Sequence, residues 1–233
     1  MKIDSYAIVY SGLNTEPYFA DATAKSDYIS AAAFGNQQGA AHTVIDYLET
    51  LSRNNNAANI EGLAASFDDL NTKMFSMGLT ASAAGAVCSK ETIQLFNVGN
   101  VRAFLFVNGY MTLHSDDHTE AYESYLSYGR QNAAEYDSIR FRKGRLNLKR
   151  MLGLSSTVQV QFYPPFPLVK DTALLICTDR FWHYLNVMEM ELDYRKSAGP
   201  EEWLKIMARR VLMKANQDLD KENFAAVTAM VED

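Results

Sequence analysis

The sequence of 233 residues has little cysteine, little proline and no long hydrophobic run. Its two cysteines, Cys88 and Cys177, are too few for a disulfide framework, and each lies inside an apolar run, so we expect buried, reduced thiols. No apolar run approaches the roughly 18 residues of a membrane span. The first 21 residues contain acids and no long apolar stretch, which is not typical of a secretory signal. These absences predict no membrane association and a cytoplasmic location.

Neither sign of charge is in large excess. The chain has 22 Lys and Arg against 28 Asp and Glu, a net charge of −6, which disfavours general nucleic-acid binding. Its 48% hydrophobic and 21% charged content is ordinary for a soluble protein and can fill a sizeable core, so the chain is not disordered as a whole. No linker or internal repeat divides it, and we expect a single domain over 1–233.

The spacing of apolar residues predicts an α+β protein. The helices are expected at 39–53, 60–75, 119–129 and 203–216. The strands are expected at 5–11, 25–35, 157–163, 172–178 and 224–231, with a strand meander over 78–115. An Asn-Gly pair at 108–109 predicts a tight hairpin turn within the meander, because both residues tolerate positive φ. No period is evident over 130–150.

The stretch LLICTDRFWHYL, 174–185, places Asp179 directly after a buried strand and Arg180 directly after Asp179. From the residues alone, two interpretations stay open. Aspartate is a good N-cap, and RFWHYL could begin a short helix. A carboxylate at the end of a strand can also bind a hard cation, but from the residues alone the N-cap is favoured.

Six segments resemble, in the same order, the motifs of the PPM or PP2C family of metal-dependent protein serine/threonine phosphatases. NVGNVRAFLFVNG resembles "NVGDSRAYL…NG", and LLICTDRFWHYL resembles "LLLCSDGLWDYL". The other four pairs are AAAFGNQQGAAH with "VADGMGGH", SDDHTEAYESYLSYG with "T.DHS…ELV..G", LKRMLG with "LTRALG", and KENFAAVTAMV with "DNITVIVV". Together they cover nearly the whole chain.

The resemblance implies an α-β-β-α sandwich, in which two antiparallel sheets are flanked by helix pairs and a metal site lies at one sheet edge. In the family, an aspartate at the position of Asp179 ligates a divalent metal. Two such metals activate a bridging water and bind the phosphate. Two dications about 3.8 Å apart repel by about 17 kcal/mol at an effective dielectric constant near 20, so the site depends on a cluster of carboxylates.

Most of that cluster is missing at the matching positions. Phe34 replaces the bridging aspartate, although Gly35 is retained, and Asn100 replaces the aspartate of "GDSR". The remaining candidate ligands are Asp179, Glu222 (followed by the matching Asn223) and Glu16. The implied cofactor is therefore at most one weakly bound Mn²⁺ or Mg²⁺ rather than a metal pair. Arg180 replaces a glycine, and its charge could pair with Asp179 in place of a metal.

A basic run, RFRKGRLNLKR, covers 140–150 with six basic residues in eleven and no acid. It is either a solvated face or a docking surface for a phosphorylated or acidic protein partner, since arginine binds phosphate through two nitrogens. The docking candidates are Arg140, Arg142, Lys143 and Arg145. The four histidines, His42, His114, His118 and His183, show no metal-binding spacing and are expected in surface or capping roles.

Three hypotheses about function follow. The leading one is a pseudophosphatase with a degraded two-metal site, which binds a protein or a phospho-ligand in signalling without turning it over. The alternative is a divergent but active Mn²⁺- or Mg²⁺-dependent serine/threonine phosphatase. The third is a structural interaction module whose cleft is packed shut by Phe34. A shift of one residue in strand register would move Phe34 to the opposite face of its sheet.

Overall fold

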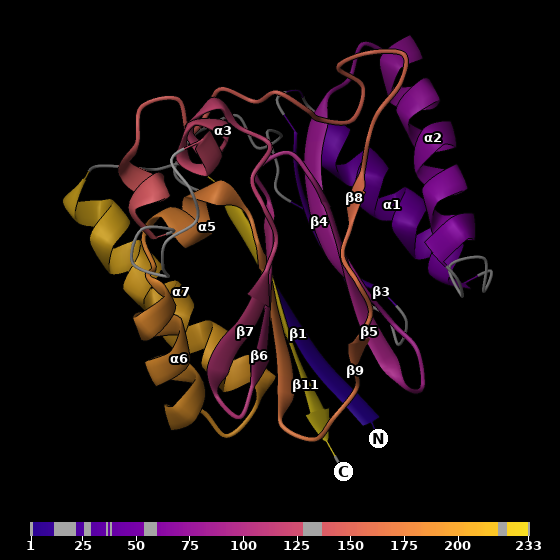
Figure 1. Ribbon diagram of the computed structural model, residues 1–233. Coiled ribbons are helices and arrows are strands. Elements are labelled where there is room, and N and C mark those ends of the chain that lie inside the picture. Colours follow the sequence, from indigo (N-terminus) through magenta and orange to yellow (C-terminus); the bar gives the residue numbers. More distant parts are fainter. Residues whose placement is uncertain are drawn as a thin grey trace.

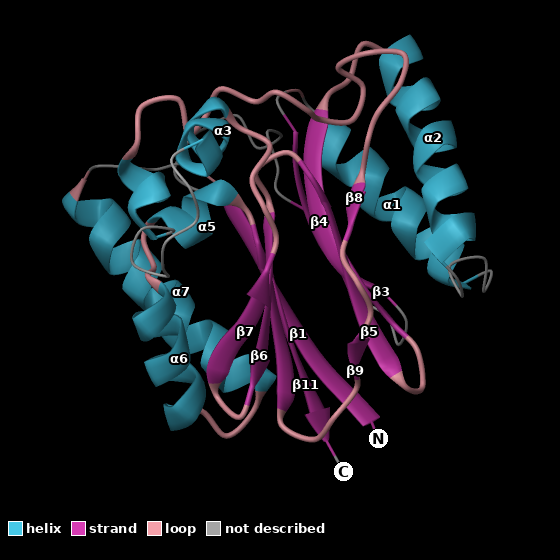
Figure 2. Cartoon of the chain, in the orientation of Figure 1, coloured by secondary structure: helices cyan, strands magenta, loops and turns pink. Residues whose placement is uncertain are grey.

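The computed structural model describes residues 2–11, 22–25, 29–35, 37, 39–53, 60–127, 137–218 and 223–232. Two antiparallel β-sheets pack against each other, and helices cover their outer faces (Figures 1 and 2). The predicted α-β-β-α sandwich is therefore confirmed.

The first sheet contains five strands in the order β1-β11-β10-β6-β7. Their bounds are Lys2–Tyr10 for β1, Arg102–Val107 for β6, Tyr110–His114 for β7, Thr172–Cys177 for β10 and Phe224–Glu232 for β11. The strands predicted near both ends of the chain are thus neighbours in this sheet. The Asn-Gly turn forms between β6 and β7, where Asn108 and Gly109 have φ values of 52° and 79°.

The second sheet has the order β2-β3-β4-β5-β8, and the short strand β9 also pairs with β5. The bounds are Ala22–Lys25 for β2, Ile29–Gly35 for β3, Ala81–Cys88 for β4, Thr92–Val98 for β5, Gln161–Phe162 for β8 and Phe166–Pro167 for β9. The strand predicted over 157–163 is wrong for most of its length. Gln161 pairs with Asn97, so the residues before 160 extend beyond the end of β5 and have no strand to pair with there.

Helices α1 (Ala40–Arg53) and α2 (Ile60–Ser76) cover the outer face of the second sheet, close to their predicted positions (Figure 1). Helices α6 (Val187–Lys196) and α7 (Pro200–Gln217) cover the outer face of the first sheet. Three shorter elements lie at one end of the sandwich, namely α3 (Glu120–Ser127), the 3₁₀ helix η1 (Ile139–Phe141) and α5 (Asp179–His183).

Hydrophobic periodicity does not predict α6, but a capping box defines its start. Asn186 Oδ1 accepts a hydrogen bond from the Glu189 backbone N–H at 2.7 Å, and Glu189 Oε2 accepts one from the Asn186 N–H at 3.1 Å. These two bonds satisfy amide groups that the first turn of a helix leaves without partners. The sequence signal for α6 is therefore the pair of capping residues at its start, rather than a periodic stripe of apolar residues.

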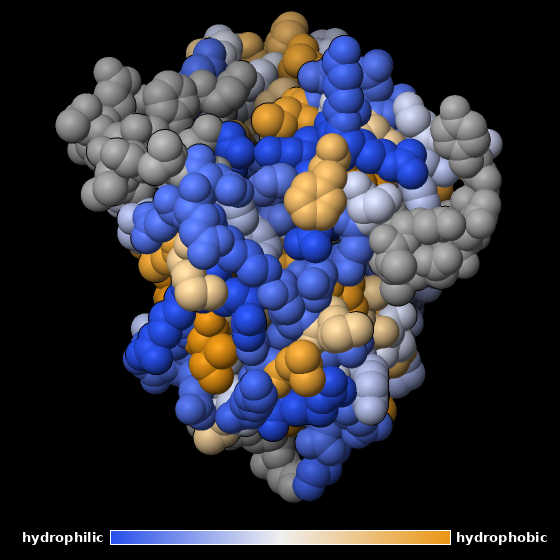
Figure 3. All heavy atoms as spheres, turned by 90° about the vertical axis from the view of Figure 1, so that its left-hand side faces the viewer, coloured by the Kyte–Doolittle hydropathy of each residue, from blue (hydrophilic) through white to orange (hydrophobic). Residues whose placement is uncertain are grey.

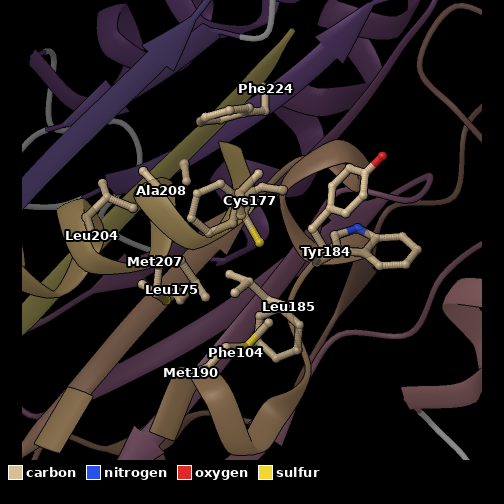
Figure 4. Packing of buried hydrophobic residues seen from close by; sticks show 14 of the residues in the cluster. Phe104, Leu175, Cys177, Tyr184, Leu185, Met190, Leu204, Met207, Ala208 and Phe224 are labelled. Carbon is tan, nitrogen blue, oxygen red and sulfur yellow. The ribbon is translucent and has the colours of Figure 1, made fainter. Parts of the chain in front are cut away.

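Both cysteines are buried and free. Cys177 points into the apolar cluster between the first sheet and its helices, among side chains that include Leu175 and Met207 (Figure 4). Burial raises the pKa of the Cys177 thiol and raises that of Cys88 to about 12. Both thiols are therefore protonated at neutral pH and serve as packing groups.

Candidate functional site

The strand registers bring the predicted site residues to one edge of the sandwich. Cys177 at the end of β10 pairs with Ala226 near the start of β11 and with Arg102 at the start of β6. In the second sheet, Gly35 at the end of β3 pairs with Ala81 at the start of β4. The turn from β5 to β6 passes from one sheet to the other at this end. Here, "the upper edge" means this end of both sheets, which lies uppermost in Figure 1.

Asp179 is the first residue of α5 and is buried, with 3% exposure. The N-cap of this helix is Thr178, so the interpretation of Asp179 as the N-cap is wrong by one residue. Asp179 forms an ion pair with Arg145, whose Nη1 donates to Asp179 Oδ2 at 3.4 Å. The carboxylate at the end of the buried strand is thus held by a cation from the basic run.

The basic run is not a uniformly solvated face. Arg140 donates from Nη1 to the carbonyl oxygen of His183 at 3.4 Å, and Arg145 reaches Asp179, so both turn toward α5. Lys143 is exposed, and Arg142 lies over the ring of Tyr125 at 5.8 Å. Of the four docking candidates, the two that contact α5 are therefore built into the upper edge.

Phe34 lies on the face of β3 that is directed toward the other sheet. Ala32, two residues earlier on the same face, belongs to the cluster between the sheets, and Phe34 packs against that cluster while half-buried. Ala33 faces the helices α1 and α2 instead. Gly35 is needed because a Cβ there would lie 2.6 Å from Ala40 Cβ and 2.8 Å from the Ala41 nitrogen.

Two buried oxygens near this edge lack a hydrogen-bond partner in the described structure, Ser82 Oγ and Asn100 Oδ1. Ser82 pairs with Phe34 across the strands, and Asn100 lies in the turn between the two sheets with 3% exposure. Gly99 has a φ of +92°, and a Cβ there would lie 2.1 Å from Ser82 Oγ. Only glycine allows this close approach, which places both oxygens at the same turn. An unpaired buried oxygen is a plausible cation ligand, although neither one carries a charge.

An internal network holds Asn100 and α5 in place. Arg102 donates to both carboxylate oxygens of Asp117, at 2.8 and 2.6 Å, and its guanidinium lies 3.5 Å from the centre of the Trp182 ring. Trp182, in α5, donates from Nε1 to the backbone oxygen of Asn100 at 2.9 Å. Sequence reasoning missed this network. The signal was available, because Arg102 is the lone charge in the apolar run VRAFLFV.

We expected a surface or capping role for His118, but this residue is buried, with 3% exposure. Its Nδ1 accepts a hydrogen bond from the Gly99 N–H at 3.1 Å, which leaves Nε2 to donate to Gln161 Oε1 at 2.9 Å. Burial lowers its pKa, and the ring is neutral at neutral pH. His118 thus supports the turn that carries Asn100.

The described residues do not fit a two-metal centre. Among them, no group of three or more His, Cys, Asp or Glu side chains could hold a metal ion. Asp179 already pairs with Arg145, and an aromatic ring stands at position 34. The candidates Glu16 and Glu222 lie outside the described residues, while Asn223 is buried just before β11.

No protein-family model matches the sequence, and a search of curated proteins finds no match. Solved structures do match over the full chain. The Mycobacterium tuberculosis serine/threonine phosphatase PstP/Ppp has a TM-score of 0.81 at 16% identity, with 100% of both chains covered. The PPM Ser-Thr phosphatase MsPP from Mycobacterium smegmatis, in complex with cacodylate, has a TM-score of 0.79 at 19% identity, with 98% of both chains covered.

A third structure is the catalytic domain of PstP in complex with two manganese ions, with a TM-score of 0.77 at 16% identity, covering 100% of this chain and 99% of that one. The structural neighbours of this chain are therefore PPM-type serine/threonine phosphatases, and its fold is PP2C-like. Within the described ranges, no helix is both long and apolar enough to span a membrane.

Proposed function

We propose that this chain is a PP2C-fold domain with impaired hydrolytic activity, which acts in signalling by binding a phosphoprotein or another protein partner. The ion pair between Arg145 and Asp179 carries this proposal, since a guanidinium stands at the carboxylate that the resemblance assigns to a metal. A guanidinium neutralises a carboxylate, but it cannot lower the pKa of a bound water as a metal ion does.

The surroundings of Phe34 support the same proposal. The resemblance matches Phe34 to the bridging aspartate, and the Phe34 ring packs against the cluster between the sheets. Restoring a carboxylate there would bring a charge to the margin of an apolar core, which is costly without a metal to neutralise it. We extend the proposal to a single domain over 1–233 in the cytoplasm, where reduced thiols such as Cys88 and Cys177 are stable.

A second candidate function is a divergent, active phosphatase that uses one Mn²⁺ or Mg²⁺. The observation that favours it is the pair of unpartnered buried oxygens, Asn100 Oδ1 and Ser82 Oγ. Together with Asp179, and with the acids Glu16 and Glu222, they would supply oxygen ligands to one hard cation. This candidate requires Arg145 to release Asp179.

Hydrolysis of p-nitrophenyl phosphate with and without excess Mn²⁺ tests the two candidates. We expect wild type and Asp179→Asn to stay at the same background rate, and calorimetry to detect no Mn²⁺ binding below the millimolar range. Lys149→Gln, an exposed change in the basic run, is the matched control for charge. Mn²⁺-dependent hydrolysis that disappears in Asp179→Asn but persists in Lys149→Gln would establish the active enzyme instead.

A further inference from the structure

Cationic side chains from two segments converge on His183, at the C-terminal end of α5. Arg140 and Arg145 come from the basic run, and Arg180 comes from α5 itself. Burial and the charges of Arg145, Arg180 and Arg140 lower the pKa of His183 to about 4, whereas a hydrogen bond with the Arg140 backbone raises it. The charges that lower this pKa belong to arginines, so the imidazole is neutral at neutral pH in a positive environment.

Two nitrogens in this cluster lack a hydrogen-bond partner in the part of the chain that the structure describes, Arg140 Nε and His183 Nδ1. They belong to residues that are already bonded to each other, through Arg140 Nη1 and the His183 carbonyl oxygen. The Arg140 Nε–H is an unpaired buried donor, which is destabilising, and it indicates that an acceptor is missing; Nδ1 of the neutral His183 ring can also donate to that acceptor when it carries the hydrogen of the ring. The acceptor that suits guanidinium groups in a positive field is an anion with several oxygens.

An aromatic side chain stands beside these nitrogens. Phe141 is 71% exposed, and its ring lies 4.6 Å from the Arg140 guanidinium carbon and 5.9 Å from the His183 ring. An exposed ring offers an apolar contact that a free inorganic anion cannot use, whereas a peptide can. Hydrophilic side chains otherwise cover most of the adjoining helical face, with hydrophobic ones in small separate groups (Figure 3).

We propose that Arg140, Arg145 and His183 form a binding site for the phosphate group of a phosphorylated side chain on a protein partner. Phe141 contacts the peptide on either side of that group. The inference rests on the proposed function, because a domain that hydrolysed its ligand would not retain it. The contact between Arg145 and Asp179, at 3.4 Å, is long enough for the guanidinium to exchange its carboxylate partner for phosphate oxygens.

Fluorescence anisotropy with a labelled phosphoserine hexapeptide, Ala-Leu-pSer-Leu-Ala-Gly, and its unphosphorylated twin tests this site. We expect the phosphorylated peptide to bind at least about tenfold more tightly than its twin, and Arg140→Gln to remove about tenfold or more of that affinity. Arg140→Lys should recover only part of the loss, because lysine keeps the charge without the planar fork. Lys149→Gln removes one exposed charge from the same run and should change the affinity less than about twofold.

A second measurement does not depend on the fold of any variant. Titration of the wild type with inorganic phosphate should shift the ¹⁵N resonances of the His183 imidazole, assigned with His183→Asn. Equal affinity for the two peptides, equal losses in Arg140→Gln and Lys149→Gln, or unmoved His183 resonances would each overturn the site. Phosphate release from the hexapeptide is followed in the same sample. Release that needs Mn²⁺ and Asp179 contradicts the proposed function, whereas absent binding without release contradicts only this inference.

Discussion

Two arginine–aspartate pairs lie near the upper edge of the sandwich, and they differ in burial and geometry. Arg102 and Asp117 have side chains only 3% and 1% exposed and share two hydrogen bonds of 2.8 and 2.6 Å. Arg145 and Asp179 share one contact of 3.4 Å, and the arginine side chain is 15% exposed. The first pair also stacks on Trp182, while the second joins a basic run to the start of a helix.

This difference indicates that the first pair supports the fold and that the second pair belongs to the functional site. A buried bidentate pair cannot exchange partners without leaving a charge uncompensated, so Arg102 holds Trp182 and, through it, the Asn100 turn. The second pair has a single long contact and an arginine side chain that is 15% exposed, so exchanging its partner costs less than breaking the first pair. An incoming anion can therefore recruit Arg145, just as an incoming cation can recruit Asp179. Arg102–Asp117, the inner pair, therefore fixes the shape of the upper edge. Arg145–Asp179, the outer pair, can exchange its partners for an incoming ion.

The largest expected effect comes from breaking the inner pair. Arg102→Ala leaves Asp117 charged and buried without its partner, which should lower the free energy of unfolding by about 3–5 kcal/mol. Urea denaturation measures this loss. Arg53→Ala, whose ion pair with Glu49 lies on an exposed helix face, is the control and should cost less than about 0.5 kcal/mol. A loss below about 1 kcal/mol for Arg102→Ala would mean that the inner pair does not support the fold.

The next effect concerns the aromatic ring of Phe34, near the end of β3. Phe34 is half-buried against the cluster between the sheets, so Phe34→Ala should lower the free energy of unfolding by about 1–3 kcal/mol. The control is Phe75→Ala on α2, where the side chain is 48% exposed and should contribute much less. Equal and small losses in the two variants would mean that Phe34 is not packed in the core and does not close a cleft at the upper edge.

Turns and periodicity are local signals and were sufficient for most of the helices and strands, whereas the sandwich arrangement was predicted from the family resemblance. The Asn108–Gly109 hairpin and helix α1 need only neighbours along the chain to specify them. The strand expected over 157–163 failed for a non-local reason, since its would-be partner β5 ends at Val98. Pairing depends on where another strand stops, and alternation of apolar residues carries no such information.

The site was only partly predictable. The resemblance brought attention to Asp179 and Asn100, and the structure places both at the upper edge. It did not indicate that Arg145, 34 residues away in sequence, would be the partner of Asp179. An ion pair between residues far apart in sequence depends on the path of the intervening chain, which local sequence patterns do not reveal.

Removing the outer arginine should affect stability less than either change above. Arg145→Gln removes one long contact from the buried Asp179 carboxylate and should lower the free energy of unfolding by about 1 kcal/mol. It also removes the competing cation, so calorimetry should detect tighter Mn²⁺ binding than in wild type. The double variant Arg145→Gln, Asp179→Asn should lose that gain. A cost of several kcal/mol would show that the outer pair supports the fold as the inner pair does. Unchanged Mn²⁺ binding would show that Arg145 does not compete with a cation at Asp179.

The smallest effect is the pH dependence that His183 adds beside the outer pair. Burial and the nearby arginines lower its pKa to about 4, against 6.5 for an unperturbed histidine. A lowered pKa means that the unfolded chain binds a proton more readily, so this contribution is complete above about pH 6.5 and is lost as the pH falls toward 4. Because the ring is only half-buried, we expect the free energy of unfolding to change by a few tenths of a kcal/mol per pH unit, well below the limit of about 1.4 kcal/mol for one proton.

Chemical denaturation between pH 4.5 and 7.5 measures this effect. The free energy of unfolding should depend less steeply on pH in His183→Asn than in wild type, with His118 unchanged in both. Parallel slopes would mean that His183 is as solvated as a surface histidine, and that the arginines do not face it.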